Sequence, residues 1–398
     1  MSRAIELKAV LSKKKVLDIP LSEPQISGNE WKYIKDCLDT GWVSSAGSYV
    51  NRFEEMGAGY IGAKYAIATV NGTSALHISL VSCNIKSDDE VIVPTLTFVA
   101  TANVVKYCGA YPILMDCKLD SLCIDAQKVS DFVVQECVQR KDGYTYNRKT
   151  GRKIKAIIPV HIFGHPADME GLLEVCGKGN IDIIEDATES LGSEYKGRKT
   201  GSFGKTGCLS FNGNKIITTG GGGMVVTDNK GIADKVRHLT TQAKKDPFEY
   251  DHDEIGYNYR LTNIQAAIGV AQMERLNDFI AIKRENAALY RDLLAEIDGI
   301  EFLWEKSWAK SNFWFYTIRV PKVHKKNLIK FLLSKNIQVR PVWKLIHTLP
   351  MYKGSQSYRI ENAVKAYETC ISLPCSLSLG KKEIEYITEN IRDYFSKL

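Results

Sequence analysis

Lys215 is the residue of this sequence best suited to covalent chemistry. It stands between two short apolar segments, residues 208–211 and 223–227, which the pattern predicts to be buried strands. An ammonium group held there is partly desolvated, which lowers its pKa and suits an amine that must form a Schiff base. Four glycines at residues 220–223 let the backbone turn tightly and lie close to a flat ligand. From this stretch alone, an exposed lysine in an ordinary hairpin is the alternative.

A second chemical feature is the turn Asn-Gly-Thr-Ser at residues 71–74, which joins a predicted strand to a predicted helix. The first N–H groups of a helix are unpaired and its N-terminus is partially positive, so this junction can bind an anion such as a phosphate. Gly72 would let the backbone approach the anion, and Thr73 and Ser74 would add hydroxyl groups. The alternative is that Thr or Ser is only a plain N-cap of the helix.

Asp186 is the third feature. It ends a short apolar segment, 181–185, which is a predicted strand. Ligands of parallel sheets bind where the strands end, and the turn at 71–74 and Phe98 would reach the same edge. A carboxylate at this edge can pair with a ring nitrogen. The alternative is a helix N-cap, because Glu189 follows at the spacing of a capping box.

These residues must be positioned by a fold in which strands alternate with helices. Apolar strands are predicted at residues 65–70, 90–94, 110–115, 155–160, 181–185, 208–211 and 223–227. The alternation predicts an α/β fold whose mostly parallel, seven-stranded sheet has helices on both faces. A strand at 313–320 and a helix at 325–334 indicate a smaller C-terminal α+β domain. The predicted organisation is an N-terminal arm (1–19), a large domain (20–258) and a small domain (259–398).

Length and composition narrow the class of protein. The net charge of +7 on 398 residues comes without a dense stripe of Lys and Arg, which argues against nucleic acid as a partner. No apolar run approaches the roughly 20 residues that span a bilayer, and residues 1–17 lack the pattern of a secretory signal, so no membrane partner is expected. The ten cysteines are scattered without CxxC spacing, which indicates reduced thiols rather than a metal site. We expect a cytoplasmic protein.

Pyridoxal 5′-phosphate (PLP) requires a lysine, a phosphate site, an aromatic neighbour and an aspartate for its ring nitrogen, and this sequence offers all four. With these residues the chain resembles the DegT/DnrJ/EryC1/StrS family of PLP-dependent nucleotide-sugar aminotransferases, which have fold type I. The resemblance runs from about residue 20 to the C-terminus. It rests on five motifs in order: Asn-Gly-Thr-Ser (71–74), Pro-Thr-Leu-Thr-Phe-Val-Ala-Thr (94–101), Glu-Asp-Ala-Thr-Glu-Ser (185–190), Ser-Phe-Asn-Gly-Asn-Lys (210–215) and Tyr-Asn-Tyr-Arg-Leu (257–261).

The resemblance implies a role for each matching residue. Lys215 would hold PLP covalently and serve as general acid and base, and Asp186 would pair with the pyridinium nitrogen. Arg260 would lie near the nucleotide of the substrate. Many relatives have Gln or His where this chain has Glu189, and a carboxylate there needs a proton or a nearby cation. The other implied cofactor contacts are Gly72, Thr73, Ser74, Phe98, Glu189, Ser210 and Asn258, the last reaching the neighbouring subunit.

The resemblance also implies a reaction. An amino acid, glutamate, would give its amino group to a nucleotide-linked keto sugar, with pyridoxamine phosphate formed during turnover and with active sites shared in a homodimer. The segments around Trp42 and Lys215 are most similar to enzymes that aminate C4 of UDP-linked 4-keto-6-deoxy-N-acetylhexosamines. Those enzymes lie on routes to bacillosamine- or legionaminic-type sugars of bacterial surface glycans. Trp42 and His347 are candidate substrate contacts.

Several alternatives share this fold. They are C4 amination of GDP-4-keto-6-deoxymannose (perosamine type) and C3 amination of a 3-keto nucleotide sugar. A PLP-dependent sugar dehydratase of the family would have histidine in place of Lys215, so Lys215 argues against it. A non-catalytic regulator would need a damaged site or an added DNA-binding domain, whereas all five motifs look intact.

Overall fold

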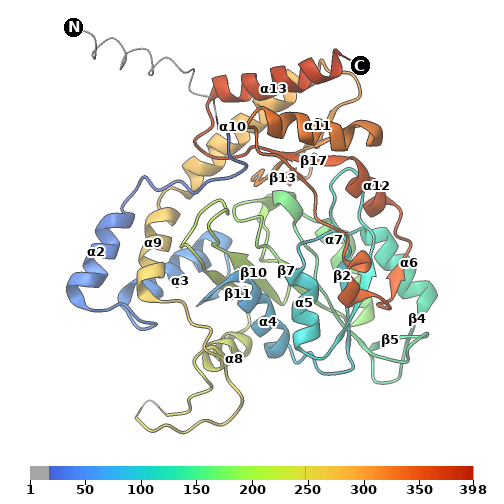
Figure 1. Ribbon diagram of the computed structural model, residues 1–398. Helices are drawn as coiled ribbons and strands as arrows, with labels where there is room; N and C mark the ends of the chain where they lie inside the picture. The colour runs from blue at the N-terminus through green and yellow to red at the C-terminus, as the bar shows by residue number, and fades with distance from the viewer. Residues whose placement is uncertain (1–17, 247, 398) are drawn as a thin grey trace.

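A sheet of eight strands forms the centre of the large domain (Figure 1). The computed structural model describes residues 18–246 and 248–397, so most of the predicted N-terminal arm lies outside the described residues. In spatial order the strands are β1 (Tyr65–Thr69), β11 (Gly223–Thr227), β10 (Thr206–Ser210), β7 (Asp182–Asp186), β6 (Ile154–Ile157), β2 (Glu90–Pro94), β3 (Tyr111–Met115) and β16 (Ser357–Tyr358). β11 is antiparallel to both neighbours, and all other pairs are parallel. The predicted α/β fold with a mostly parallel sheet is confirmed.

The predicted number of strands is one too few. All seven predicted strands are present, and β2 and β11 have the predicted bounds. The eighth strand, β16, comes from the C-terminal part of the chain and pairs with β3 at the edge of the sheet. A strand of two residues is too short to show the alternation by which strands are recognised in a sequence.

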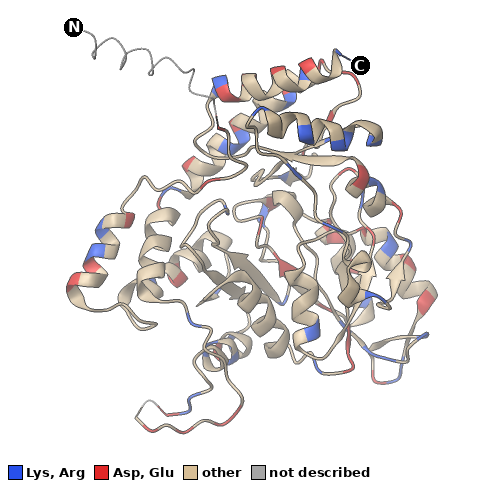
Figure 2. Cartoon of the chain, in the orientation of Figure 1, with Lys and Arg blue, Asp and Glu red and all other residues tan. Residues whose placement is uncertain are grey.

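Helices cover both faces of the sheet. Successive residues of β2 point to opposite faces, so Val91 and Val93 enter one core and Ile92 enters the other. The first core packs against α4 (Gly72–Ser82), α5 (Ala100–Tyr107) and α8 (Lys230–Thr240), and the second against α3 (Ser48–Ile61), α6 (Ala126–Glu136), α7 (Met169–Gly179) and α9 (Asn263–Met273). The first helix in the described residues, α2 (Glu30–Thr40), packs against α9 and ends where Gly41 turns left-handed. Figure 2 shows that α4, whose sides are buried, carries no charged residue.

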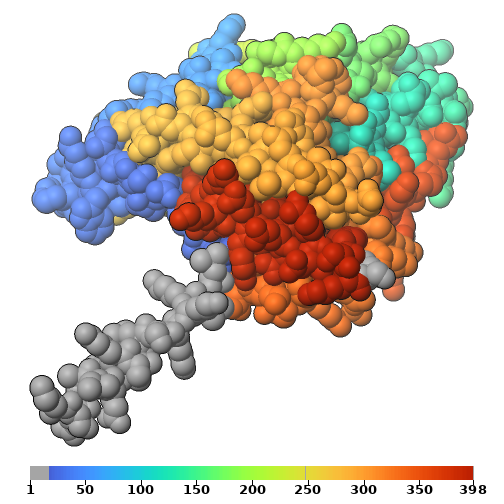
Figure 3. All heavy atoms as spheres, turned by 90° about the horizontal axis from the view of Figure 1, so that it is seen from above, coloured from blue at the N-terminus to red at the C-terminus, as the bar shows by residue number. Residues whose placement is uncertain are grey.

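The small domain has its own sheet and core. Its strands are β12 (Glu301–Phe302), β14 (Tyr316–Arg319), β17 (Cys370–Leu373) and β15 (Arg340–Pro341), in that order. Its main helices are α10 (Leu276–Leu294), α11 (Lys322–Ser334) and α13 (Lys381–Phe395), and Figure 3 shows α13 in red against α10 in gold. The core of this domain combines Ile19 with residues from Ala287 onwards. Division of the chain at residues 258 and 259 stays a prediction.

The remaining elements are short connections. They are β4 (Cys137–Gln139), β5 (Thr145–Asn147), β8 (Glu194–Tyr195), β9 (Arg198–Lys199), β13 (Ala309–Lys310), α12 (Asn362–Thr369) and the 3-10 helices η1 (Ile162–Gly164), η2 (Ile346–Thr348) and η3 (Pro350–Tyr352). The ten cysteines are free thiols, and all except Cys108 are buried. Among the described helices, none has both the length and the apolar character needed to cross a membrane.

Candidate active site

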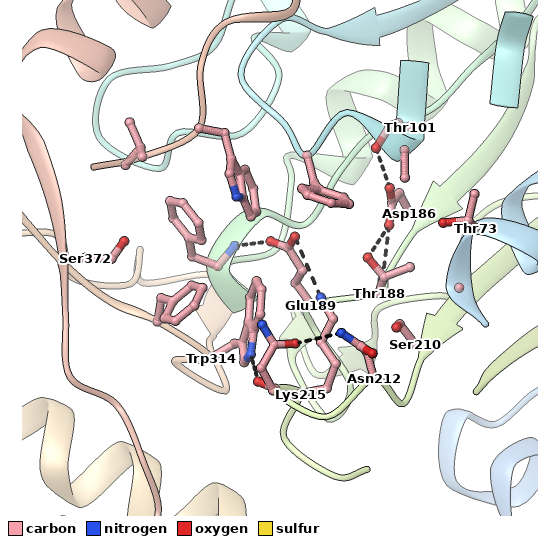
Figure 4. Close-up of a pocket in the computed structure, with 18 of the residues that line it drawn as sticks. Thr73, Thr101, Asp186, Thr188, Glu189, Ser210, Asn212, Lys215, Trp314 and Ser372 are labelled. Carbon is pink, nitrogen blue, oxygen red and sulfur yellow. Dashed lines mark hydrogen bonds and ion pairs between the residues drawn. The ribbon is translucent and has the colours of Figure 1, made fainter. Parts of the chain in front are cut away.

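The carboxyl ends of β7 and β10 and the start of α4 open onto a cavity of about 670 Å³ (Figure 4). The cavity lies between the large and the small domain, because Trp314 and Ser372 line it opposite Asp186 and Ser210. Its volume is in the range of pockets that bind cofactors and small substrates. This is the edge of the sheet at which the sequence places the chemistry.

Lys215 lies in the loop between β10 and β11. The loop is closed by backbone hydrogen bonds, in which Phe211 N–H donates to the Gly222 carbonyl at 2.8 Å and Lys215 N–H donates to the Asn212 carbonyl at 3.0 Å. The Lys215 side chain is only 13 % exposed, so the alternative of an exposed hairpin lysine is wrong. Its Nζ lies 4.0 Å from Oε1 of Glu189. Burial lowers the pKa of Lys215, and the carboxylates nearby partly oppose that shift.

Asp186 is held by two threonines rather than by a helix. The hydroxyl of Thr101 donates to Oδ2 at 2.7 Å, and the hydroxyl and N–H of Thr188 donate to Oδ1 at 2.7 and 3.2 Å. The N-cap alternative is wrong, because residues 187–192 form turns and no helix begins there. Asp186 is buried and faces the cavity, so its carboxylate is oriented for a ligand. Thr101 and Thr188 were not singled out from the sequence, although both lie within the quoted motifs.

Glu189 is a buried carboxyl group beside the lysine. Its Oε2 accepts a hydrogen bond from Phe163 N–H at 2.8 Å, and its other oxygen faces Lys215. Burial raises the pKa of Glu189, the Lys215 charge partly offsets the rise, and Asp186 adds to it. The cation that a carboxylate needs at this position is therefore supplied by Lys215.

The start of α4 forms an anion cradle. The helix is capped by Asn71, whose Oδ1 accepts from Ser74 N–H at 2.7 Å, so Thr73 is not the cap and its side chain faces the cavity. A Cβ added to Gly72 would lie 2.8 Å from Cβ of Ser210. Only glycine lets the end of β10 approach the helix so closely. Ser74 is buried and does not line the cavity.

The small domain supplies a facing wall that the sequence did not reveal. The small-domain residues that line the cavity include Trp314, Arg340, Lys344 and Ser372. Arg340 and Ser372 are directly opposite one another in the pairing of β15 with β17. Within the described residues, no carboxylate pairs with Arg340 or Lys344; Arg340 donates only to the Gln338 amide oxygen and the Val339 carbonyl. The cavity thus has two cations at its mouth that are free to meet an anion.

Besides Ser74, four candidate residues lie outside the cavity lining of this chain. Asn258 is exposed, and Trp42, 59 % exposed, lies in the loop after α2. His347 shares a hydrogen bond of 2.7 Å with the hydroxyl of Thr95, and burial lowers the pKa of His347. Arg260 is buried in an ion pair with Glu54 of α3. Their predicted contacts with cofactor or substrate stay predictions.

The residues that do line the cavity fit PLP. The start of α4 with Gly72, Thr73 and Ser210 offers backbone N–H groups and hydroxyls for a phosphate. Phe98 lines the cavity and is 52 % exposed, so one ring is open to a flat ligand. A buried carboxylate and a lysine of lowered pKa complete the set that a pyridine aldehyde requires.

Comparison with known proteins identifies the family. The DegT/DnrJ/EryC1/StrS aminotransferase family matches residues 24–392. This chain belongs to that family. Its predicted family, fold class, enzyme class and PLP cofactor are confirmed, and the chain is a PLP-dependent sugar aminotransferase.

Relatives and solved structures of this aminotransferase family cover nearly the whole chain. GDP-perosamine synthase of Escherichia coli O157:H7 is 39 % identical over 380 residues, which are 95 % of this chain and 99 % of the relative. UDP-4-amino-4,6-dideoxy-N-acetyl-beta-L-altrosamine transaminase of Campylobacter jejuni is 31 % identical over 373 residues, 92 % of this chain and 94 % of the relative. The structure of Helicobacter pylori PseC, an aminotransferase involved in the biosynthesis of pseudoaminic acid, superposes with a TM-score of 0.87 at 26 % identity and covers 96 % of this chain and 100 % of that chain.

Proposed function

We propose that this aminotransferase moves an amino group from glutamate to the C4 ketone of a nucleotide-linked 4-keto-6-deoxy sugar. The observation that carries the proposal is the 39 % identity to a GDP-perosamine synthase over nearly the full length of both chains. This favours GDP-4-keto-6-deoxymannose as the first candidate acceptor, ahead of the UDP-linked sugar that the sequence motifs suggest. A UDP-linked 4-keto-6-deoxy-N-acetylhexosamine is the second candidate, supported by the likeness to the Campylobacter jejuni transaminase.

The side chains of the large domain supply the chemistry of amino transfer. When bound, PLP supplies an aldehyde for the amino group and a protonated ring that withdraws electrons. Asp186, oriented by Thr101 and Thr188, places a negative charge where the cationic ring nitrogen would lie. Lys215 would take a proton from the carbon that bears the amino group and return one to the cofactor side; the lowered pKa of Lys215 keeps its amine unprotonated before this transfer.

The charge of the small-domain wall supports anionic substrates. Arg340 and Lys344 line the cavity and have no carboxylate partner among the described residues. A guanidinium group binds a carboxylate or a phosphate in a forked arrangement, and an ammonium group adds a point charge. The glutamate carboxylates and the diphosphate of a nucleotide sugar are the anions that these two cations would meet.

We also propose that the chain works as a homodimer that shares its active sites. Large apolar side chains are exposed on two segments that project from the main body in Figure 1: Trp31 and Leu38 on α2, and Tyr250 and Ile255 on the segment before Asn258. Large apolar side chains gathered on projecting segments often mark an interface with another protein. Sedimentation of the purified protein would show a dimer, and Trp31→Glu would shift it toward the monomer; a monomer of the unchanged protein would refute this arrangement.

The substrate test is a turnover assay with a panel of GDP-, UDP- and dTDP-linked keto sugars, with glutamate as donor. We expect amination at C4 of the GDP-linked 4-keto sugar and none with Lys215→Ala. Preference for the UDP-linked sugar would favour the second candidate. If the PLP-loaded protein aminates no 4-keto sugar of the panel, the proposed substrate class is wrong.

A further inference from the structure

Trp314 is a residue of the small domain whose ring lies against the reacting lysine. It lies two residues before β14, is 3 % exposed and lines the cavity. Each of its polar groups is bonded: its backbone N–H donates to Oδ1 of Asn312 at 2.9 Å, its carbonyl accepts from Nζ of Lys283 at 2.8 Å, and its indole Nε1–H donates to the Asn214 carbonyl at 2.6 Å. The backbone of Trp314 is therefore held at both its N–H and its carbonyl, and the indole is held by its own hydrogen bond.

The face of this indole meets the amine of Lys215. Nζ of Lys215 lies 3.7 Å from the ring centroid, beside the indole in Figure 4. The face of an indole is electron-rich and attracts a cation, most strongly where water is excluded. The Nε1–H bond ends on Asn214, the residue directly before the lysine. One side chain thus holds both the lysine amine and the loop that carries it.

The other charged groups around the amine come from several elements. Glu189, in the turn after β7, lies 4.0 Å from Nζ, and Asp186 at the end of β7 acts from farther away. Arg340 and Lys344 line the same cavity from the small domain. Burial disfavours a positive charge on Nζ of Lys215. The contacts that stabilise an ammonium group at this point are therefore few, and the indole is one of them.

The proposed reaction would benefit from such a contact. With PLP bound, the amine of Lys215 would be free during part of each cycle and would take a proton from the substrate carbon, which would leave an ammonium group in a buried cavity. Lys215 would then give this proton to the cofactor side, so its amine would again be unprotonated at the end of the transfer. We propose that Trp314 is a positioning residue of this reaction: its indole face stabilises the protonated, released Lys215, and its Nε1–H bond fixes the lysine loop. This rests on the assignment of Lys215 as the reacting lysine, which Lys215→Ala tests by itself.

The first test measures Lys215 in the cofactor-free enzyme, where neither substrate nor PLP can mask the effect. The rate of acetylation by acetic anhydride is followed against pH by peptide mass spectrometry, with Lys330, exposed on α11, as the internal reference. Trp314→Leu removes the ring face, so the apparent pKa of Lys215 should fall by about one unit, the size of a desolvated cation–π contact. Trp304→Leu is the matched control, because Trp304 also faces a cation, Arg291, but does not line the cavity.

The second test separates the two contacts of the indole. Trp314→Phe keeps a weaker ring face and removes the Nε1–H hydrogen bond. The apparent pKa of Lys215 should therefore fall, but by less than in Trp314→Leu. If Trp314→Leu does not fold, the result with Trp314→Phe tests the proposal instead. In the PLP-loaded enzyme, Trp314→Leu should slow conversion of the cofactor by glutamate about tenfold, in line with one pKa unit. It should also enlarge the isotope effect of α-deuterated glutamate. Labelling profiles that coincide with that of the unchanged protein, or an unchanged isotope effect, would overturn the proposal.

Discussion

Replacement of Arg260 by Ala should destabilise the protein because it breaks a buried ion pair. Nη1 of Arg260 lies 2.5 Å from Oε1 of Glu54, and both side chains are only 8 % exposed. Nη1 also donates to the Ala68 carbonyl at 3.3 Å. The pair connects α3 with the segment that leads into α9. Its loss leaves a buried carboxylate with fewer partners.

The structure sets the size of the effect. At 2.5 Å and an effective dielectric constant of about 20, the gross Coulomb attraction is about 7 kcal/mol, most of which desolvation cancels. Removal of one partner of a buried pair costs about 3–5 kcal/mol. Glu54 would keep the Ala68 N–H at 2.7 Å and Arg237 at 3.0 Å, and Arg237 is half exposed. We therefore expect the free energy of unfolding to fall by about 3 kcal/mol, the lower end of this range, and Tm to fall by on the order of 5 °C.

The assay is thermal and urea unfolding of Arg260→Gln, Glu54→Gln and the double variant, beside Arg260→Ala. If the charges act on each other, the double variant loses less stability than the sum of the single ones. Kinetics with the nucleotide sugar are measured on the same preparations. An Arg260→Ala protein with unchanged Tm and a raised KM for the nucleotide sugar would refute the reasoning. That outcome would favour the substrate contact that the family resemblance implies.

Three further predictions concern the site and its surroundings. Asp186→Asn keeps the shape of the site and loses its charge, so kcat should fall much more than the fraction of bound PLP, and equal losses would contradict the role of Asp186. Gly72→Ala should weaken PLP binding, measured by fluorescence titration, because the new Cβ would crowd Ser210, whereas Gly59→Ala in α3 has open space and should leave binding unchanged. Burial lowers the pKa of His165 to about 4, against about 6.5 in an unfolded chain, so the unfolded state takes up the proton first as the pH falls. Stability should therefore be lost between about pH 6.5 and 4, by up to about 3 kcal/mol, and unfolding of His165→Gln over this range should lack that part of the pH dependence.

The large-domain sheet could be predicted because its signals are local. β2 and β11 are runs of buried, mostly β-branched residues bounded by turns, and their predicted bounds match the structure. The strand predicted at 313–320 is shorter in the structure, where β14 covers only Tyr316–Arg319 and Phe313 has a left-handed φ of 48°. A run of aromatic residues favours a strand locally, but the packing of the two domains decides where the chain bends.

Only the large-domain side of the cavity could be predicted from the sequence. Lys215, Asp186 and Thr73 stand next to turns that follow buried strands, so their place at the edge of the sheet can be read from the sequence. Trp314 and Arg340 reach the same cavity only because the small domain packs onto the large one. No local pattern marks that packing. The spacing of Asp186 and Glu189 shows the reverse case. It matches a capping box and so predicts a helix start, but residues 187–192 form turns instead.

Apart from Leu21, the cavity is assembled from two stretches of chain that are far apart in the sequence. Residues 71–215 supply the lysine and the carboxylates, and residues 314–372 supply the opposite wall. If this wall contacts the substrate as proposed, mutations in the second stretch would change which substrate is accepted while the proton-transfer groups are inherited unaltered. With such a division, substrate specificity can change during evolution while the catalytic residues are kept. Trp314 is the exception, because a change there would alter the acceptor wall and the basicity of the lysine in one step.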